Sequence, residues 1–383
     1  MFRFISGMIV AAATLVAAAV WADDAAVATL AGKGAVLSEK GGEVSLTVEM
    51  TRPVGWRLWM ADDPPRVVVE LSEFAWSKTP NLRSTSIAAL EIVETGPNLS
   101  ELHAVLREPL GVLSAEMIAA EDGTAVLNVR LQPTTADVFQ SDLEADLAKN
   151  SADTKRLVIA LDPGHGGSDP GAEAGALREA DLVLNFCKRL RDILLASGKF
   201  GVVLTRSDDQ LLSLDARLTR AREAEADVLL SFHADALVDA DAASGIVLYR
   251  LSDDARAAAN LRLRERHSGD DLLNGLDLTN AGEDVTVALL DLASLDTTPR
   301  TEALSTALLN AMVGADLLVN TRPEREGEFA VLKAADIPSL LIELGFLSTE
   351  ADLARLTSKE WQTAAAKAIR DGLLLWAEED ALR

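Results

Sequence analysis

The stretch Leu157-Val-Ile-Ala-Leu161, followed by Asp162-Pro-Gly-His-Gly-Gly-Ser-Asp-Pro170, decides the fold of the second half of the chain. A short apolar run that ends in a glycine-rich loop predicts a buried strand and a sharp turn, because glycine adopts backbone angles that clash for other residues. Strand and helix patterns then alternate to the end of the chain. We expect strands at 156–161, 202–205, 228–232, 246–250, 330–333 and 340–344, and helices at 178–197, 214–224, 301–318 and 359–378. This alternation predicts a three-layer α/β domain with a mostly parallel sheet over residues 156–383.

Residues 27–132 show a different pattern of short, alternating strands. From Val44 to Val48 apolar residues alternate with polar ones, and similar runs recur between clusters of turn residues. Strands at this spacing predict an all-β sandwich. The polar stretch 133–155, with one short helix expected at 142–149, is interpreted as the linker between the two domains.

The chain is strongly acidic. Its 383 residues include 60 Asp and Glu against 36 Lys and Arg, which gives a formal net charge of -24. Binding to phosphate groups needs clustered cations, so the composition argues against nucleic acid and anionic membrane surfaces as partners. The single cysteine, Cys187, excludes an intrachain disulfide and is interpreted as a buried core thiol.

The N-terminus has the pattern of a cleavable secretory signal. Arg3 supplies a positive charge, the run from Ile5 to Val20 is apolar, and Ala22 offers a small residue for cleavage. An uncleaved membrane anchor is the alternative, although the apolar run is short for a span of the bilayer. We therefore expect residues 1–22 to be a signal peptide and the mature protein to lie in the periplasm.

Two histidines and two glutamates stand where a catalytic site is expected. His165 and His233 each follow a predicted strand, and the carboxyl ends of parallel strands meet at one edge of a sheet. Glu179 lies at the start of the helix that returns from the His165 loop; alone it would be only a favourable charge on the helix dipole. Glu343 lies inside an apolar run, where an unpartnered carboxylate is costly to bury and its pKa should rise.

These four positions resemble the zinc-dependent N-acetylmuramoyl-L-alanine amidases, the type-3 amidases of cell division. The resemblance covers about 156–377 and is carried by the motifs Asp162–Ala172, the glutamate after Gly175, Ser231–Ala236 and Ile342–Ser348. It implies that His165, Glu179 and His233 bind Zn²⁺ with one position left open, and that Glu343 is the catalytic acid/base. The expected reaction is hydrolysis of the amide between N-acetylmuramic acid and L-alanine in peptidoglycan, for septal wall splitting and daughter-cell separation.

Two further segments resemble parts of this family. The run Val67–Leu71 after Pro64-Pro65-Arg66 resembles the AMIN domain, which implies targeting to peptidoglycan at the septum. A long insertion at about 252–295 resembles that of members in which a helix covers the active site until an activator binds. This implies autoinhibition and a LytM-domain activator linked to the divisome; the chain itself is expected to be a monomer.

Within the insertion, Glu265 is the candidate for an acidic cap on the zinc. His267 occupies a position where many relatives carry a second acid, so it is a second candidate for contact with the metal. The alternative is that both are solvated residues on a helix face.

Two other functions remain open at this point. A zinc carboxypeptidase acting on stem peptides would use the same metal ligands, and only its products would differ. A non-catalytic wall-binding protein would be expected to have lost a ligand or the glutamate, whereas this chain retains all four.

Overall fold

The computed structural model describes residues 27–77, 84–96, 99–152, 156–235, 244–255 and 283–381. The expected signal peptide at 1–22 and residues 256–282 of the insertion, with Glu265 and His267, lie outside the described residues. Among the described helices, none is both long enough and apolar enough to span a membrane.

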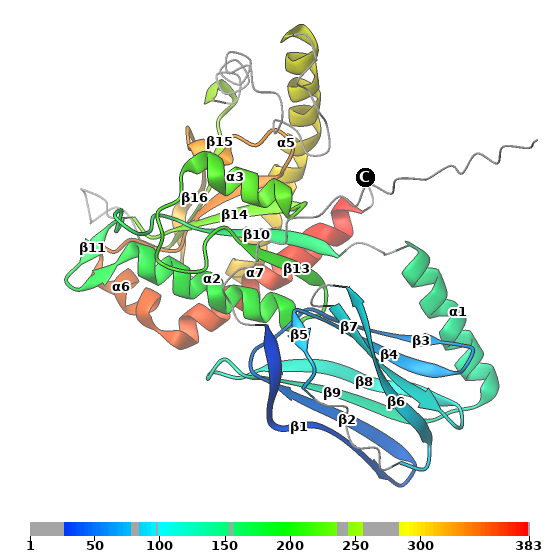
Figure 1. Cartoon of the computed structure of the whole chain (residues 1–383). Helices are drawn as coiled ribbons and strands as arrows, with labels where there is room; N and C mark the ends of the chain where they lie inside the picture. The colour runs from blue at the N-terminus through cyan, green and yellow to red at the C-terminus, as the bar shows by residue number, and fades with distance from the viewer. Residues whose placement is uncertain are drawn as a thin grey trace, which may run out of the picture.

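The N-terminal unit consists of two β-sheets that share one hydrophobic core (Figure 1). One sheet has the strand order β5-β1-β2-β9-β8 and the other the order β3-β4-β7-β6, and all pairs but β1–β5 are antiparallel. In β2 every second residue is buried, as the alternation between Val44 and Val48 predicts. The strands are β1 (Ala28–Lys40), β2 (Glu43–Met50), β3 (Trp56–Ala61), β4 (Arg66–Ser72), β5 (Phe74–Ala75), β6 (Ile87–Gly96), β7 (Leu99–Leu106), β8 (Leu110–Ala119) and β9 (Ala125–Pro133).

The stretch expected to be a linker is mostly helix α1 (Ala136–Ala152), which is longer than the helix expected at 142–149. Phe139 and Leu143 of α1 are buried in the core of the N-terminal unit. Asp146 also accepts a hydrogen bond from the backbone N–H of Met60 in β3, at 3.0 Å. The helix is therefore packed onto the N-terminal unit, and apolar residues in a polar stretch were the signal of that packing.

The second half of the chain forms a six-stranded mixed sheet covered by helices on both faces (Figure 1). The order is β13-β10-β14-β17-β15-β16, in which the first four strands are parallel and β15 runs antiparallel to β17. Helices α2, α5 and α7 pack on one face, whereas α3 and the short 3-10 helix η3 pack on the other. The elements are β10 (Leu157–Pro163), β11 (Glu173–Ala174), β12 (Leu177–Arg178), α2 (Glu179–Ala196), β13 (Phe200–Leu204), α3 (Leu214–Glu223), β14 (Val228–His233), β15 (Ile246–Leu251), α5 (Glu283–Gly314), β16 (Val319–Gly327), η3 (Ala330–Leu332), β17 (Ser339–Glu343), α6 (Glu350–Thr357) and α7 (Lys359–Asp380).

Two local expectations were wrong, and one strand was not expected. The run 330–333 is the 3-10 helix η3 and not a strand, because three apolar residues carry no period that separates the two. The edge strand β16 was missed, since it contains four charged residues in nine and one proline, as edge strands often do. The helix expected at 301–318 is part of a longer continuous helix, α5, which begins at Glu283, passes through Pro299 and ends at Gly314.

The two units meet at the C-terminal end of α2. The indole N–H of Trp56 in β3 donates to the carbonyl of Ala196 at 3.0 Å. Glu70 in β4 accepts from Arg156, which directly precedes β10, at 3.0 Å. A side chain at Gly198 would lie 3.0 Å from the Trp56 ring, so the two units are closely packed here.

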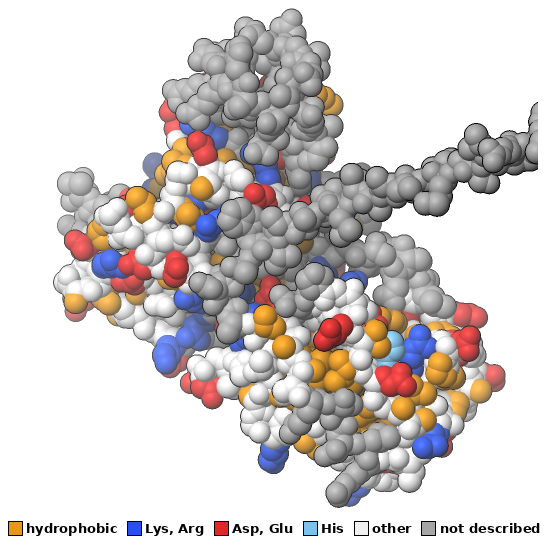
Figure 2. Space-filling view, viewed as in Figure 1, with side chains coloured by type: hydrophobic (Ala, Val, Ile, Leu, Met, Phe, Trp, Pro, Cys, Tyr) orange, Lys and Arg blue, Asp and Glu red, His pale blue; other side chains and the backbone are white. Residues whose placement is uncertain are grey.

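Figure 2 shows the charged side chains of the described residues on one face of the molecule. Several basic side chains lie together at the lower left edge of the α/β unit, and acidic and basic side chains are interspersed elsewhere on that face.

Candidate metal centre

The parallel strands β10, β14 and β17 end at the same edge of the sheet, and three of the four expected site residues lie at those ends. His233 is the last residue of β14, and it is the direct neighbour of Glu343, the last residue of β17. His165 lies in the loop after β10. Its backbone is in the left-handed region, with φ of 59°, and Gly166 and Gly167 continue the turn at 123° and 61°. Glu179 is the first residue of α2, the helix that returns from this loop.

These positions bring three donor groups to one point. Donor atoms of His165, Glu179 and His233 all lie within 4.8 Å of one another. Oε1 of Glu179 is 3.2 Å from Nε2 of His165 and 3.1 Å from Nδ1 of His233. Two nitrogen or oxygen donors on one zinc-sized ion are about 3 Å apart, given bonds of about 2 Å. The spacing and the chemistry of the three donors therefore fit a divalent metal ion.

The electrostatics of the three groups favour a cation between them. Burial tends to raise the pKa of Glu179, but hydrogen bonds from His165 and His233 hold it well below its usual range. The hydrogen bond to Glu179 in turn raises the pKa of His165 to about 9. Without a metal ion, a proton on the imidazole supplies the positive charge that the buried carboxylate requires. A metal ion would replace that proton.

Neighbouring groups fix which histidine nitrogen faces the site. Nδ1 of His165 is 2.9 Å from Oδ2 of Asp169, which leaves Nε2 for the metal. The backbone N–H groups of Ala172 and Ala234 each donate to Glu179 at 2.9 Å. The carboxylate is thus held by the loop after β10 and by the end of β14 together.

Glu343 lies beside this cluster in a different environment. Its side chain is buried, and burial raises its pKa to about 7. Oε2 of Glu343 accepts a hydrogen bond from the backbone N–H of Asp235 at 3.1 Å. Such a carboxyl group exchanges a proton readily near neutral pH, which suits a general base that later acts as an acid.

The structure therefore brings His165, Glu179 and His233 together and places Glu343 on the adjacent strand. His103 lies far from them in β7, paired with Glu101 at 2.6 Å. Two buried arginines that were not predicted from the sequence, Arg206 and Arg217, also contact the His165 loop. The sequence carries no clear signal for them, since Arg206 stands in a polar stretch and Arg217 in a helix rich in charged residues.

Comparison with known proteins agrees with this geometry. A family profile described as "N-acetylmuramoyl-L-alanine amidase" matches residues 159–374, a span that contains all four residues. This chain belongs to the N-acetylmuramoyl-L-alanine amidase family. The N-acetylmuramoyl-L-alanine amidase AmiC of Neisseria meningitidis is 29% identical over 88% of this chain and 88% of its own length. AmiC of Escherichia coli O6:H1 is 31% identical over 59% of this chain and 54% of its own length. Among solved structures, an amidase from Clostridium difficile is 25% identical over 58% of this chain and 97% of its own, with a TM-score of 0.44.

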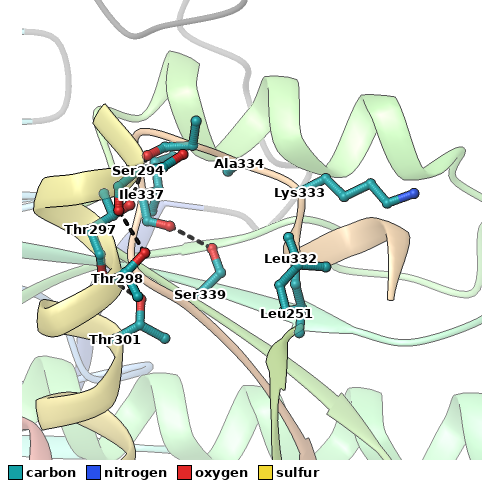
Figure 3. Close-up of a pocket in the computed structure, with 11 residues that line it drawn as sticks. Leu251, Ser294, Thr297, Thr298, Thr301, Leu332, Lys333, Ala334, Ile337 and Ser339 are labelled. Atoms are coloured by element: carbon teal, nitrogen blue, oxygen red, sulfur yellow. Dashed lines mark hydrogen bonds between the residues drawn. The ribbon is translucent and has the colours of Figure 1, made fainter. Parts of the chain in front are cut away.

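A second polar feature of this amidase-family chain lies at the end of the sheet that is opposite the metal centre (Figure 3). There a cleft of about 20 Å³ opens between α5, the segment after η3 and Ser339, the first residue of β17. This space holds about one water molecule. Hydroxyl groups line it, and the buried Oγ of Ser294 in α5 has no hydrogen-bond partner among the residues that the structure describes. It is too small for a wall fragment.

Proposed function

We propose that this chain is a zinc-dependent hydrolase of the amide bond between N-acetylmuramic acid and L-alanine in peptidoglycan. The observation that carries the proposal is the convergence of His165, Glu179 and His233 on one point beside the buried Glu343. Two imidazoles and one carboxylate are the ligand set of many catalytic zinc sites, which keep a further position open. Family membership favours the amidase over the zinc carboxypeptidase and the wall-binding protein.

In the proposed reaction, three residues bind the metal ion and a fourth transfers the proton. His165, Glu179 and His233 hold the ion, which when bound supplies Lewis acidity to the scissile carbonyl and to the attacking water. Glu343 accepts a proton from that water as the C–O bond forms. It then donates the proton to the alanine nitrogen as the C–N bond breaks. The Asp235 N–H holds Oε2 of Glu343, and within the described residues nothing donates to Oε1, which is therefore the oxygen that carries the proton.

The test combines metal analysis with digestion of purified peptidoglycan. The wild type should contain one zinc ion per chain and release intact stem peptides from the glycan. Glu343→Gln should retain zinc and lose activity by about 10²- to 10⁴-fold, the usual contribution of a general acid–base group. His233→Ala should lose both. Release of free amino acids instead of whole stem peptides would identify a carboxypeptidase, and full activity in Glu343→Gln would remove the assigned role.

The proposal also gives a role to each of the other segments of the chain. Residues 1–22 serve as a signal peptide that directs the protein to the periplasm, 27–132 form an AMIN-like sandwich, 133–155 join it to the catalytic domain at 156–383, and the enzyme splits the septal wall. The two sheets with a shared core support the sandwich. Fusion of residues 1–152, which keep the signal peptide, to a fluorescent protein that folds in the periplasm tests the targeting: it should gather at division sites, and an even distribution around the cell would contradict it.

Regulation by the insertion is the remaining part of the proposal, with Glu265 or His267 as the cap and a LytM-domain protein as activator. The described flanks of the insertion, Leu251 and Ser294, lie at the end of the sheet opposite Glu343. The 27 residues 256–282 can reach about 90 Å when extended, and the five-residue strand β17 is about 17 Å long. The segment is thus long enough to return to the metal centre.

Because α5 is continuous from residue 283, the informative deletion is narrower than the whole insertion. Replacing 256–282 with a short Gly-Ser linker should raise the basal rate of wall hydrolysis and remove any dependence on an activator. Unchanged basal activity in a folded deletion variant would contradict autoinhibition. A point variant, Glu265→Ala, should reproduce part of the increase if this residue is the cap.

A further inference from the structure

We propose that Arg206 and Arg217 are positioning residues that hold the His165 loop in the shape required for metal binding. The inference rests on the proposed metal site. Neither arginine touches a donor atom of that site; both act on the backbone that carries His165.

Arg217 is a buried residue of α3, and its guanidinium group forms hydrogen bonds with residues 162, 163 and 165 at the end of β10 and in the loop that follows. One nitrogen donates to Oδ1 of Asp162 at 2.7 Å and to the carbonyl of Pro163 at 2.6 Å. The other donates to the carbonyl of His165 at 2.8 Å. Asp162 in turn accepts from Ser231 of β14 at 2.7 Å, two residues before His233. The network around Arg217 therefore reaches the strands that carry both histidines.

Arg206 approaches the same loop from the end of β13. It is 1% exposed, and no carboxylate lies within ion-pair distance of it among the residues that the structure describes. Its guanidinium donates to the carbonyls of Pro163 at 2.9 Å, Gly164 at 2.7 Å and Ala180 at 2.9 Å. Ala180 follows Glu179 directly. Arg206 thus joins the His165 loop to the first turn of the helix that carries the carboxylate donor.

A buried cation bound only by carbonyl groups is a poor source of stability, because its desolvation is expensive. Its value here lies in geometry. His165 has a left-handed backbone, which a residue with a Cβ adopts only when its surroundings impose it. The carbonyls of residues 163, 164 and 165 are all held by the two arginines. The loop therefore cannot relax to an ordinary conformation.

The loop also lies directly against the second histidine. A Cβ added at Gly164 would be 2.3 Å from Cε1 of His233. A shift of the loop by a fraction of an ångström would therefore move His165 and press on the His233 ring at the same time. Metal affinity depends steeply on such outer contacts, which typically contribute ten- to a hundredfold.

The experiment uses the full chain with Arg206→Lys and Arg217→Lys. Lysine keeps the positive charge but lacks the planar fork that reaches several carbonyls at once. The matched control is Arg222→Lys, because Arg222 is also on α3 and pairs with Asp336 at 2.9 Å, away from the loop. Three quantities are measured: zinc affinity by chelator competition, the visible absorption spectrum of the Co²⁺-loaded protein, and the melting temperature of the metal-free protein.

Both loop variants should lose about ten- to a hundredfold in zinc affinity and show an altered Co²⁺ spectrum, while the control stays within about twofold of wild type. Folded Arg206→Lys and Arg217→Lys proteins with wild-type zinc affinity and spectrum would overturn the inference. So would an equal loss in Arg222→Lys, which would indicate general destabilisation. If Arg206→Lys does not fold, Arg217→Lys decides, since it keeps the charge opposite Asp162. A wild type that binds no zinc would instead refute the proposed function itself.

Discussion

At the scale of residues, the burial of Glu343 has a cost in stability that depends on pH. Its carboxyl group is buried at the end of β17 with a single backbone donor, and burial raises its pKa from 4.5 to about 7. In the unfolded chain the same group ionises near its usual pKa. The folded protein therefore loses stability as the pH rises, in the opposite direction to a glutamate whose pKa is lowered by a salt bridge.

The consequence can be measured on the metal-free protein with Glu343→Gln. Below the unfolded pKa of 4.5 both states are protonated; between 4.5 and about 7 the unfolded state ionises first, and above about 7 the difference is constant. The pKa of Glu343 differs by about 2.5 units between the unfolded and folded states, and each unit corresponds to 1.36 kcal/mol. At pH 8 the buried carboxylate therefore lowers the free energy of unfolding of the wild type by about 3 kcal/mol.

We therefore expect Glu343→Gln to gain about 3 kcal/mol relative to wild type between pH 4 and pH 8, in urea titrations followed by circular dichroism. The surface change Glu378→Gln corrects for the loss of one negative charge. A stability difference between Glu343→Gln and wild type that does not vary with pH would contradict the burial of the carboxylate.

At the scale of elements, α5 lines the polar cleft with a stretch that contains a proline and several hydroxyl side chains. Pro299 removes one backbone hydrogen bond from the helix, and Thr297, Thr298 and Thr301 bond back to carbonyls four residues earlier. The Thr297 hydroxyl also lies 2.8 Å from the carbonyl of Ala335, so its one proton is shared between two carbonyls, whereas the neighbouring Ser294 hydroxyl has no hydrogen-bond partner among the described residues. Of these two hydroxyls, one turn apart in α5, that of Thr297 is hydrogen-bonded and that of Ser294 is buried without a bond among the described residues.

This difference predicts opposite effects of two similar substitutions. Ser294→Ala removes an unpartnered hydroxyl and adds a better helix former, so it should raise the free energy of unfolding by about 0.5–1 kcal/mol. Thr297→Val keeps the shape but leaves the Ala335 carbonyl unpaired, so it should lower that free energy by about 1–2 kcal/mol. Urea midpoints at constant slope measure both. A loss of stability in Ser294→Ala would show that the cleft holds a water bound to that hydroxyl.

The same elements show what could be predicted from the sequence. The runs at 157–161, 228–232 and 340–344 were recognisable because buried parallel strands are continuously apolar. The site was marked by a histidine shortly after each of the first two runs and by the glutamate at 343 inside the third. The edge strand β16 lacked that signal, since one side of it faces solvent and its charges are tolerated there. Arg206 and Arg217 were missed because only the folded loop reveals that their partners are backbone carbonyls.

At the scale of the whole molecule, α2 connects the two units to the metal centre. Its first residue is Glu179, and the carbonyl of its last residue, Ala196, accepts the indole N–H of Trp56 from the N-terminal unit. The bridge from Arg156 to Glu70 lies nearby and joins the start of β10 to β4. A ligand that binds at one end of such a helix stabilises everything that unfolds together with it.

We therefore expect one thermal transition for the wild type by calorimetry, and zinc should shift it as a whole. Trp56→Phe combined with Arg156→Gln removes two polar contacts across the junction and should split the transition into two, of which zinc shifts only the catalytic one. Trp76→Phe is the matched control, because it removes an indole hydrogen bond to Ser100 within the N-terminal unit. It should lower the melting temperature without splitting the transition. Two transitions in the wild type, or equal behaviour of the two variants, would mean that the units unfold independently and that zinc binding is not transmitted along α2.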